Sequence, residues 1–255
     1  MSRVRVDPRP LLIEGFNIKY RDARDVVAIG ECIVANVYRT DLIRQGATVL
    51  DIGAGIGEFS VIASKRVGAA GKVVAIEPNP ADFAVLVRNI GVNGLRNVTP
   101  MNVAISDFRG TLTIDFKNES FLARALPLGS ALEEAGVTRL DFIKMDVEGL
   151  EKVIVPISID LMGRARFVSM ELHGDQSEVR SMLETRGFRQ VPLSSGDATL
   201  RVASYLIRHP IRSLLMYSRV RMLSGYSFFE LMMRVLRGLG ITREQTLQVV
   251  LFRRP

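Results

Sequence analysis

Three carboxylates and one histidine lie at or just beyond the ends of two apolar segments, where they could transfer protons or bind a divalent cation. They are Asp146, Glu148, Glu171 and His173. The first two follow an apolar run that ends at Met145, and the other two close the next such run. If both runs are parallel strands, their carboxyl ends meet at the ligand-binding edge of a sheet. Alternation along the second strand would place Glu171 and His173 on one face.

Each of these residues also has an ordinary structural interpretation. His173 could be a hydrogen-bonding residue at a strand end, and Glu148 could be an acid that favours a helix N-terminus. As a base, His173 has a suitable unperturbed pKa, and it is the only histidine in the main domain. The sequence leaves three roles open for this group, namely proton transfer, cation binding and structural support.

The elements that position these side chains are organised around a glycine-rich stretch at residues 47–58. An apolar run closes with Asp51, and Gly53, Gly55 and Gly57 then alternate before an apolar-periodic segment. This pattern predicts a buried strand, a turn and a helix. Glycine permits positive φ and close approach of a ligand, and a helix N-terminus offers free N–H groups. The third glycine falls four residues after the first, whereas dinucleotide-binding turns place it five after, which disfavours a nicotinamide cofactor.

The D-x-G-x-G-x-G spacing resembles motif I of the class I S-adenosylmethionine-dependent methyltransferases; the alternative is a glycine-rich turn without a ligand. Under the resemblance, Glu77 at the end of the next strand would accept hydrogen bonds from the ribose hydroxyls, unless it is a helix cap or an exposed acid. Residues 102–104 would line the adenine, and a helix predicted over 25–43 would cover the ligand end of the first strand. The predicted cofactor-binding residues are Tyr38, Asp51, Gly53, Ala54, Gly55, Gly57, Glu77, Pro78, Asn79, Asn102, Val103, Ala104 and Asp146.

Five segments of the chain resemble, in order and spacing, the FkbM family of methyltransferases over roughly residues 31–191. They read V-L-D-I-G-A-G-I-G, A-I-E-P-N-P, N-V-A-I-S-D, D-F-I-K-M-D-V-E-G and M-E-L-H. The resemblance implies O-methylation of a sugar, glycan, glycolipid or secondary-metabolite hydroxyl with S-adenosylmethionine as methyl donor. Gly55 is a departure, since the family more often has asparagine there. A hydroxyl nucleophile benefits from a base or a metal, so Asp146, Glu148, Glu171 and His173 are the candidate catalytic residues and, if a divalent cation is present, its ligands.

The predicted fold class is α/β, a Rossmann-like class I methyltransferase fold. We expect a seven-stranded, mostly parallel sheet in the order 3-2-1-4-5-7-6, with helices on both faces and a helical insertion before the last strand. The predicted parts are a hairpin and helix covering the cofactor site at 1–46, the methyltransferase core at 47–196, a basic helical cap at 197–240 and the last core strand at 241–255.

Composition agrees with a soluble globular protein. The chain has 255 residues, of which 47% are hydrophobic and 24% charged, enough for one α/β domain with a full core. Cys32 is the only cysteine, so no intrachain disulfide can form and a reducing compartment is compatible. The sequence shows neither a signal-peptide core nor an apolar run of about 18 residues. We therefore expect a cytoplasmic protein, with peripheral membrane contact as an open alternative.

Positive charge is concentrated at the C-terminal end. Residues 1–200 carry 24 Lys and Arg against 25 Asp and Glu, a net of −1, whereas residues 201–255 carry ten Arg and only two acids. Apolar residues recur at helical spacing between these arginines. The predicted cap would therefore hold an acidic or lipid-linked acceptor, or rest on an anionic membrane. The alternative is that its helices pack on the sheet edge with their arginines solvated.

Two further function classes compete with O-methylation of a small molecule or glycan. An RNA methyltransferase would use the basic C-terminal region to bind nucleic acid, but the chain shows no recognisable RNA-binding module, and basic charge without interleaved exposed aromatic residues is a weak signal. A non-catalytic binding module is disfavoured by the intact cofactor motif. The acceptor, the methylated position, the metal dependence and the oligomeric state are left open by the sequence.

Overall fold

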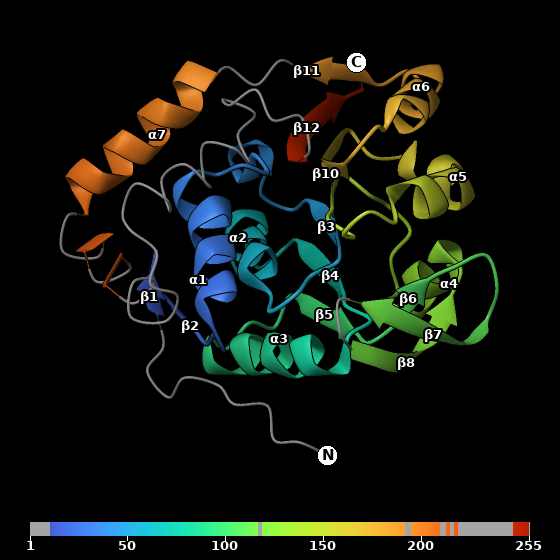
Figure 1. Ribbon diagram of the computed structural model, residues 1–255, viewed down its shortest axis with the longest axis horizontal. Helices are drawn as coiled ribbons and strands as arrows, with labels where there is room; N and C mark the ends of the chain where they lie inside the picture. The colour runs from blue at the N-terminus through green and yellow to red at the C-terminus, as the bar shows by residue number, and fades with distance from the viewer. Residues whose placement is uncertain are drawn as a thin grey trace.

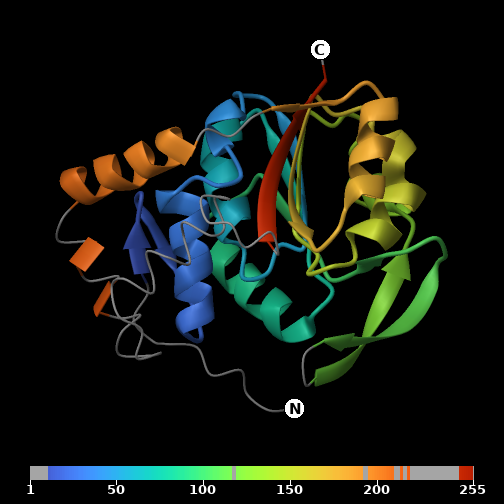
Figure 2. The same ribbon diagram turned by 45° about the horizontal axis from the view of Figure 1, so that its top comes forward.

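A central sheet with helices on both faces forms the core of the molecule (Figures 1 and 2). The computed structural model describes residues 11–116, 119–191, 195–209, 213–214, 217–218 and 247–254. Helices α1 to α3 lie on one side of the sheet, and α4 to α6 lie on the other. Their bounds are Ala23–Ile29 for α1, Glu58–Val67 for α2, Pro80–Val92 for α3, Leu128–Glu134 for α4, Glu151–Met162 for α5 and Ser177–Thr185 for α6.

The main sheet has the predicted strand order. Its seven strands run β5-β4-β3-β9-β10-β12-β11, which is 3-2-1-4-5-7-6 when the core strands are numbered along the chain. The last strand, β12, is antiparallel to both of its neighbours, and the other pairings are parallel. The strands are β3 Thr48–Ile52, β4 Lys72–Ile76, β5 Val98–Met101, β9 Phe142–Met145, β10 Phe167–His173, β11 Arg189–Val191 and β12 Leu247–Arg253. This confirms the predicted class I methyltransferase architecture.

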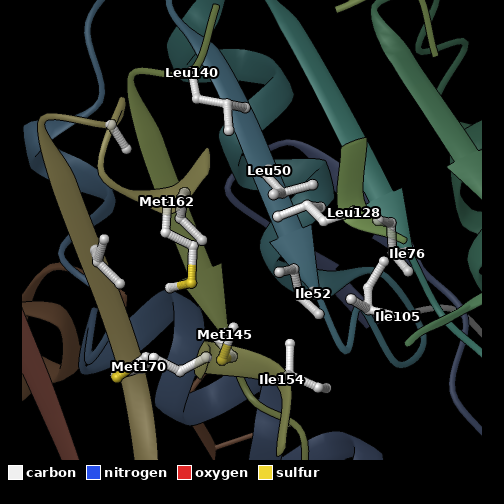
Figure 3. Close-up of a cluster of buried hydrophobic side chains, with 14 of the residues drawn as sticks. Leu50, Ile52, Ile76, Ile105, Leu128, Leu140, Met145, Ile154, Met162 and Met170 are labelled. Atoms are coloured by element: carbon white, nitrogen blue, oxygen red, sulfur yellow. The ribbon is translucent and has the colours of Figure 1, made fainter. Parts of the chain in front are cut away.

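Alternation along the buried strands divides the core into two layers. In β3, Leu50 and Ile52 pack with Met145 and Met170 in the layer shared with α4, α5 and α6 (Figure 3). Val49 points the other way, into the layer shared with α2. Burying each such side chain contributes about 1.5–3 kcal/mol, so the apolar strands can lie only between two helical layers. This arrangement fixes the carboxyl ends of β3, β4, β9 and β10 at one edge.

A small second sheet replaces part of one predicted strand. The strand expected at 98–105 is split, because β5 pairs with β4 whereas β6 (Ala104–Ile105) pairs with β8 (Glu119–Leu126). Asn102 lies at the break, and its side-chain amide donates to the carbonyl oxygens of Glu77 and Pro78. The extra strand predicted at 110–116 is present as β7 (Gly110–Phe116), antiparallel to β8. The expected N-terminal hairpin is also present, as β1 (Leu11–Ile13) and β2 (Phe16–Ile18).

The single long helix predicted over 25–43 is wrong. Helix α1 ends at Ile29 and continues as one π-helical turn, η1 (Gly30–Val34), followed by the short 3-10 helix η2 (Thr40–Leu42). Asn36 and Arg39 between them adopt left-handed backbone angles, with φ of 51° and 58°, which no helix continues through. The Asn36 side chain accepts from the backbone N–H of Thr40 at 2.8 Å and stabilises the bend. Because of this bend, Tyr38 lies at the ligand edge of the sheet, beside Asp146 and Glu171.

The C-terminal region is described only in part. Helix α7 (Ser195–Arg208) lies beside α1 (Figures 1 and 2) and packs against η1 and the hydrophobic cluster around it through Val202 and Tyr205. Residues 219–246, with most of the arginines of the predicted cap, lie outside the described residues. Within the described ranges, no helix combines the length and the apolar character needed to cross a membrane. The basic cap stays a prediction.

Candidate active site

The glycine turn lies at the carboxyl end of β3 and packs directly on β9. Gly53, Gly55 and Gly57 all have positive φ, of 74°, 53° and 90°. A Cβ on Gly53 would lie 1.7 Å from the backbone oxygen of Asp146, so valine there would disrupt the fold as well as any ligand contact. The sequence predicted positive φ and close ligand approach for these glycines, and the structure adds this packing requirement at Gly53. Among the described residues, a Cβ on Gly55 would meet only Glu58 Oε2, at 4.0 Å, so these residues leave that side of the turn open.

Glu77 connects the end of β4 to the glycine turn. Its Oε2 accepts from the backbone N–H of Gly55 and its Oε1 from that of Asn79, both at 2.8 Å. Burial raises the pKa of Glu77 to about 7. Each carboxylate oxygen keeps a further lone pair, so ribose binding is compatible with these contacts. Asn79 itself caps α3, since its side chain accepts from the N–H of Ala81 at 2.8 Å. Val103 and Ala104, which were predicted to line the adenine, are buried.

A buried ion pair supports the turn from below. Asp51 is fully buried, accepts from Ser60 Oγ at 2.7 Å, and lies 3.2 Å from Lys144 Nζ. Lys144 Nζ also donates to the backbone oxygen of Gly53 at 2.5 Å. Burial lowers the pKa of Lys144, but the acids Asp51, Asp146 and Glu58 outweigh it and hold that pKa above its usual value. Asp51 therefore supports the turn through Lys144, and its predicted contact with the cofactor stays a prediction.

Sequence reasoning gave Lys144 no role. The signal was a lysine inside the apolar run D-F-I-K-M, because a buried cation on a core strand requires a buried partner.

Tyr38 joins two of the predicted catalytic acids. Its hydroxyl lies 2.9 Å from Asp146 Oδ2 and 2.9 Å from Glu171 Oε2. One hydroxyl has one proton to donate, so both contacts are hydrogen bonds only if one carboxyl is protonated. Burial, together with the nearby Asp146, raises the pKa of Glu171 to about 8. The raised pKa of Glu171 favours an arrangement in which Tyr38 donates to one of the two acids and the other acid carries a proton.

His173 is held by a buried carboxylate that the sequence analysis missed. Its Nδ1 lies 2.9 Å from Oε1 of Glu151, which is fully buried as the first residue of α5. Glu151 also accepts from the N–H of Gly149 at 3.2 Å and from Gln176 Nε2 at 3.3 Å. The hydrogen bond to Glu151 raises the pKa of His173 to about 8. Because Nδ1–H faces Glu151, the neutral ring presents Nε2 to the site.

Glu148 precedes the helix that it was expected to begin. The expected helix start at Glu148–Gly149 is wrong, since α5 begins at Glu151 and Glu148 lies in the preceding turn with φ of 52°. Its half-exposed carboxylate reaches within 4.0 Å of His173 Nε2. The D-V-E-G-L-E segment contains two glutamates that are close in sequence, and only the packing of α5 shows which one contacts the histidine.

Three of the four predicted cation ligands come together. Asp146, Glu171 and His173 each bring one ligand atom, and these atoms lie within 4.8 Å of one another. The arrangement can therefore serve a proton acceptor, with His173 held by Glu151 and the two acids held by Tyr38, or a cation.

Comparison with known proteins identifies the family. Residues 51–190 match the model of the methyltransferase FkbM domain. The chain belongs to this family. It is similar to the ubiquinone/menaquinone biosynthesis C-methyltransferase UbiE of Escherichia fergusonii, with 28% identity over 58% of this chain and 69% of that protein. The same enzyme of Salmonella newport is 27% identical over the same shares.

Solved structures show partial likeness. A SAM-dependent methyltransferase from Aquifex aeolicus has a TM-score of 0.41 and 18% identity, covering 67% of this chain and 90% of that one. Trm5b from Pyrococcus abyssi has a TM-score of 0.43 and 18% identity, covering 71% and 48%. The FkbM domain makes this chain an S-adenosylmethionine-dependent methyltransferase.

The residues at the glycine turn fit this cofactor. S-adenosylmethionine carries a sulfonium and, near neutral pH, an α-ammonium group, and the turn is surrounded by acids. Glu77 keeps acceptor capacity at the end of β4, where the ribose is expected. Oε2 of Glu58 is buried without a hydrogen-bond partner among the described residues. Gly55 leaves its side of the turn open. A cationic ligand suits these donors and acceptors.

Replacing Glu77 by glutamine is expected to weaken binding of S-adenosylmethionine about tenfold to hundredfold. The amide loses the charged acceptor, and a hydrogen bond to a charged group contributes about 1.5–3 kcal/mol. Isothermal titration calorimetry measures the affinity, and Glu133→Gln, an exposed acid on α4, is the matched control. Unchanged affinity in Glu77→Gln would remove Glu77 from the cofactor site.

Proposed function

We propose that this enzyme transfers the methyl group of S-adenosylmethionine to a hydroxyl oxygen of a sugar, glycan, glycolipid or secondary metabolite. The observation that carries the proposal is the His173–Glu151 pair at the ligand edge, with Nδ1 and Oε1 2.9 Å apart. A hydroxyl has a high pKa and must lose its proton as the new bond to carbon forms. A histidine oriented by a buried carboxylate suits that task.

The chain's own residues have separate roles in this reaction. The glycine turn and Glu77 would hold the cofactor, which supplies an electrophilic methyl group when bound. His173 Nε2 accepts the hydroxyl proton, and Glu151 stabilises the imidazolium that results. The Tyr38 hydroxyl keeps the side chains of Asp146 and Glu171 in place through its 2.9 Å contacts with both. The acceptor oxygen forms a bond to the methyl carbon, the bond from that carbon to sulfur breaks, and the proton rests on His173.

The Asp146, Glu171 and His173 group could instead hold a divalent cation that lowers the pKa of the acceptor hydroxyl. The Tyr38 hydroxyl already bonds one oxygen of each acid, so the proton-acceptor role accounts for their positions without an ion. We therefore expect the initial rate to survive dialysis against a chelator and to be unchanged by added Mg²⁺ or Mn²⁺. Loss of activity on chelation, with recovery on adding a divalent ion, would assign the group to a metal.

The acceptor class is tested by a methyl-transfer screen. Cofactor labelled in its methyl group is supplied to the enzyme with glycan, lipid and RNA fractions, and labelled products are analysed by mass spectrometry. We expect the label in a glycan or lipid fraction as an O-methyl ether. UbiE is named as a C-methyltransferase, so label on carbon would overturn the hydroxyl proposal, as would label confined to RNA bases.

A further inference from the structure

Glu58 is a buried acid beside the glycine turn, and one of its carboxylate oxygens has no described hydrogen-bond partner. It is the first residue of α2 and directly follows Gly57. Its side chain is only 9% exposed, and its Oε2 has no hydrogen-bond partner among the described residues. This oxygen lies 4.0 Å from the position a Cβ on Gly55 would take, on the open side of the turn. Burying a carboxylate without a partner is costly, so its place next to a binding turn points to a ligand.

The charged groups around Glu58 leave it without a dedicated cation in the described part of the chain. They are Lys144 on β9, Asp51 on β3 and Asp25 on α1, with the buried thiol of Cys32 in η1 close by. Lys144 already lies 3.2 Å from Asp51, and the two aspartates are acids like Glu58 itself. Burial raises the pKa of Glu58 to about 8, so this group is largely protonated at pH 7.

We propose that Glu58 recognises the positive charge of the methionine portion of S-adenosylmethionine bound at the glycine turn. A cation close to a buried carboxyl favours its ionised form strongly, because the surroundings screen the interaction poorly. The inference rests on the cofactor and is independent of the acceptor, so it stands whether or not the acceptor is a hydroxyl.

The proposal has a measurable consequence for protons. A bound cation lowers the pKa of Glu58, so below about pH 8 cofactor binding releases a proton from this group. By linkage, the contribution of Glu58 to affinity grows as pH rises towards about 8 and is level above it. Glu77, with a pKa of about 7, and the α-amino group of the cofactor also titrate in this range. The Glu58 contribution is therefore the difference between the wild type and a matched variant.

The experiment is calorimetric titration of S-adenosylmethionine into wild type and Glu58→Gln from pH 6 to pH 9. Two buffers of different ionisation enthalpy at each pH give the number of protons released. We expect Glu58→Gln to bind about tenfold more weakly or worse at pH 8.5, since one unit of pKa shift corresponds to tenfold. The deficit should shrink towards pH 6, and proton release at pH 7 should fall measurably below that of the wild type.

Adenosine, which lacks both positive charges of the cofactor, is the control ligand and should bind wild type and Glu58→Gln alike. Glu58→Asp keeps the charge and should retain proton release; it replaces Glu58→Gln if thermal unfolding shows that the glutamine variant does not fold. Equal affinity and equal proton release in wild type and Glu58→Gln would overturn the proposal. An equal loss of affinity for adenosine would also overturn it, because that result would indicate a structural role only.

Discussion

Replacing His173 by alanine is expected to lower turnover by about 10²–10⁴-fold, the range for a lost general base, with affinity for S-adenosylmethionine nearly unchanged. The reason is geometric, because His173 presents Nε2 to the site while the predicted cofactor contacts lie at the glycine turn and Glu77. Steady-state rates and calorimetric titration measure the two quantities separately. His209→Ala, which removes the other histidine of the chain, is the control and should keep wild-type turnover. A comparable loss of cofactor affinity in His173→Ala would contradict the assignment.

The same assignment fixes the direction of the pH dependence. The hydrogen bond to Glu151 raises the pKa of His173 to about 8, and a proton acceptor works only when unprotonated. The rate should therefore rise as pH increases through about 8 and level off above it. In Glu151→Gln the raising contact is lost, so the rise should move to lower pH, and the maximal rate should fall because the ring is no longer held. A profile that does not move in Glu151→Gln would separate Glu151 from the base.

Replacing Lys144 by methionine is expected to destabilise the protein by about 3–5 kcal/mol, because removing one partner of a buried pair leaves the other charge uncompensated. The remaining partner, Asp51, is fully buried and lies 3.2 Å from Lys144 Nζ. Urea unfolding measures the free energy of unfolding. The double variant Asp51→Asn/Lys144→Met should recover part of the loss, since no buried charge is then left alone. A loss under about 1 kcal/mol, or no recovery in the double variant, would show that the two residues are not coupled.

The sequence by itself determined the strands of the sheet and the edge at which the candidate site lies. Buried apolar strands and the glycine turn after Asp51 predicted a strand–turn–helix unit. The fold class and the strand order were implied by the resemblance to the class I methyltransferases. The carboxyl ends of parallel strands meet at one edge, so the sequence predicted that Asp146, Glu171 and His173 lie close together. The structure places their ligand atoms within 4.8 Å of one another. The strands and the grouping of their end residues follow from the spacing of apolar residues and from the order of the segments along the chain, and both can be read from the sequence.

Only the tertiary structure decided which groups hold those side chains. Tyr38 contacts Asp146 and Glu171, which follow it in the chain by 108 and 133 positions. It reaches them because the expected helix breaks at Asn36 and Arg39. Lys144 reaches Gly53 from the neighbouring strand β9. Glu151, the first residue of α5, lies 2.9 Å from His173, whereas Glu148 in the preceding turn comes only within 4.0 Å. The physical reason is that a buried charge is stabilised by whichever partner the packing brings within about 3 Å, and sequence spacing does not record that distance.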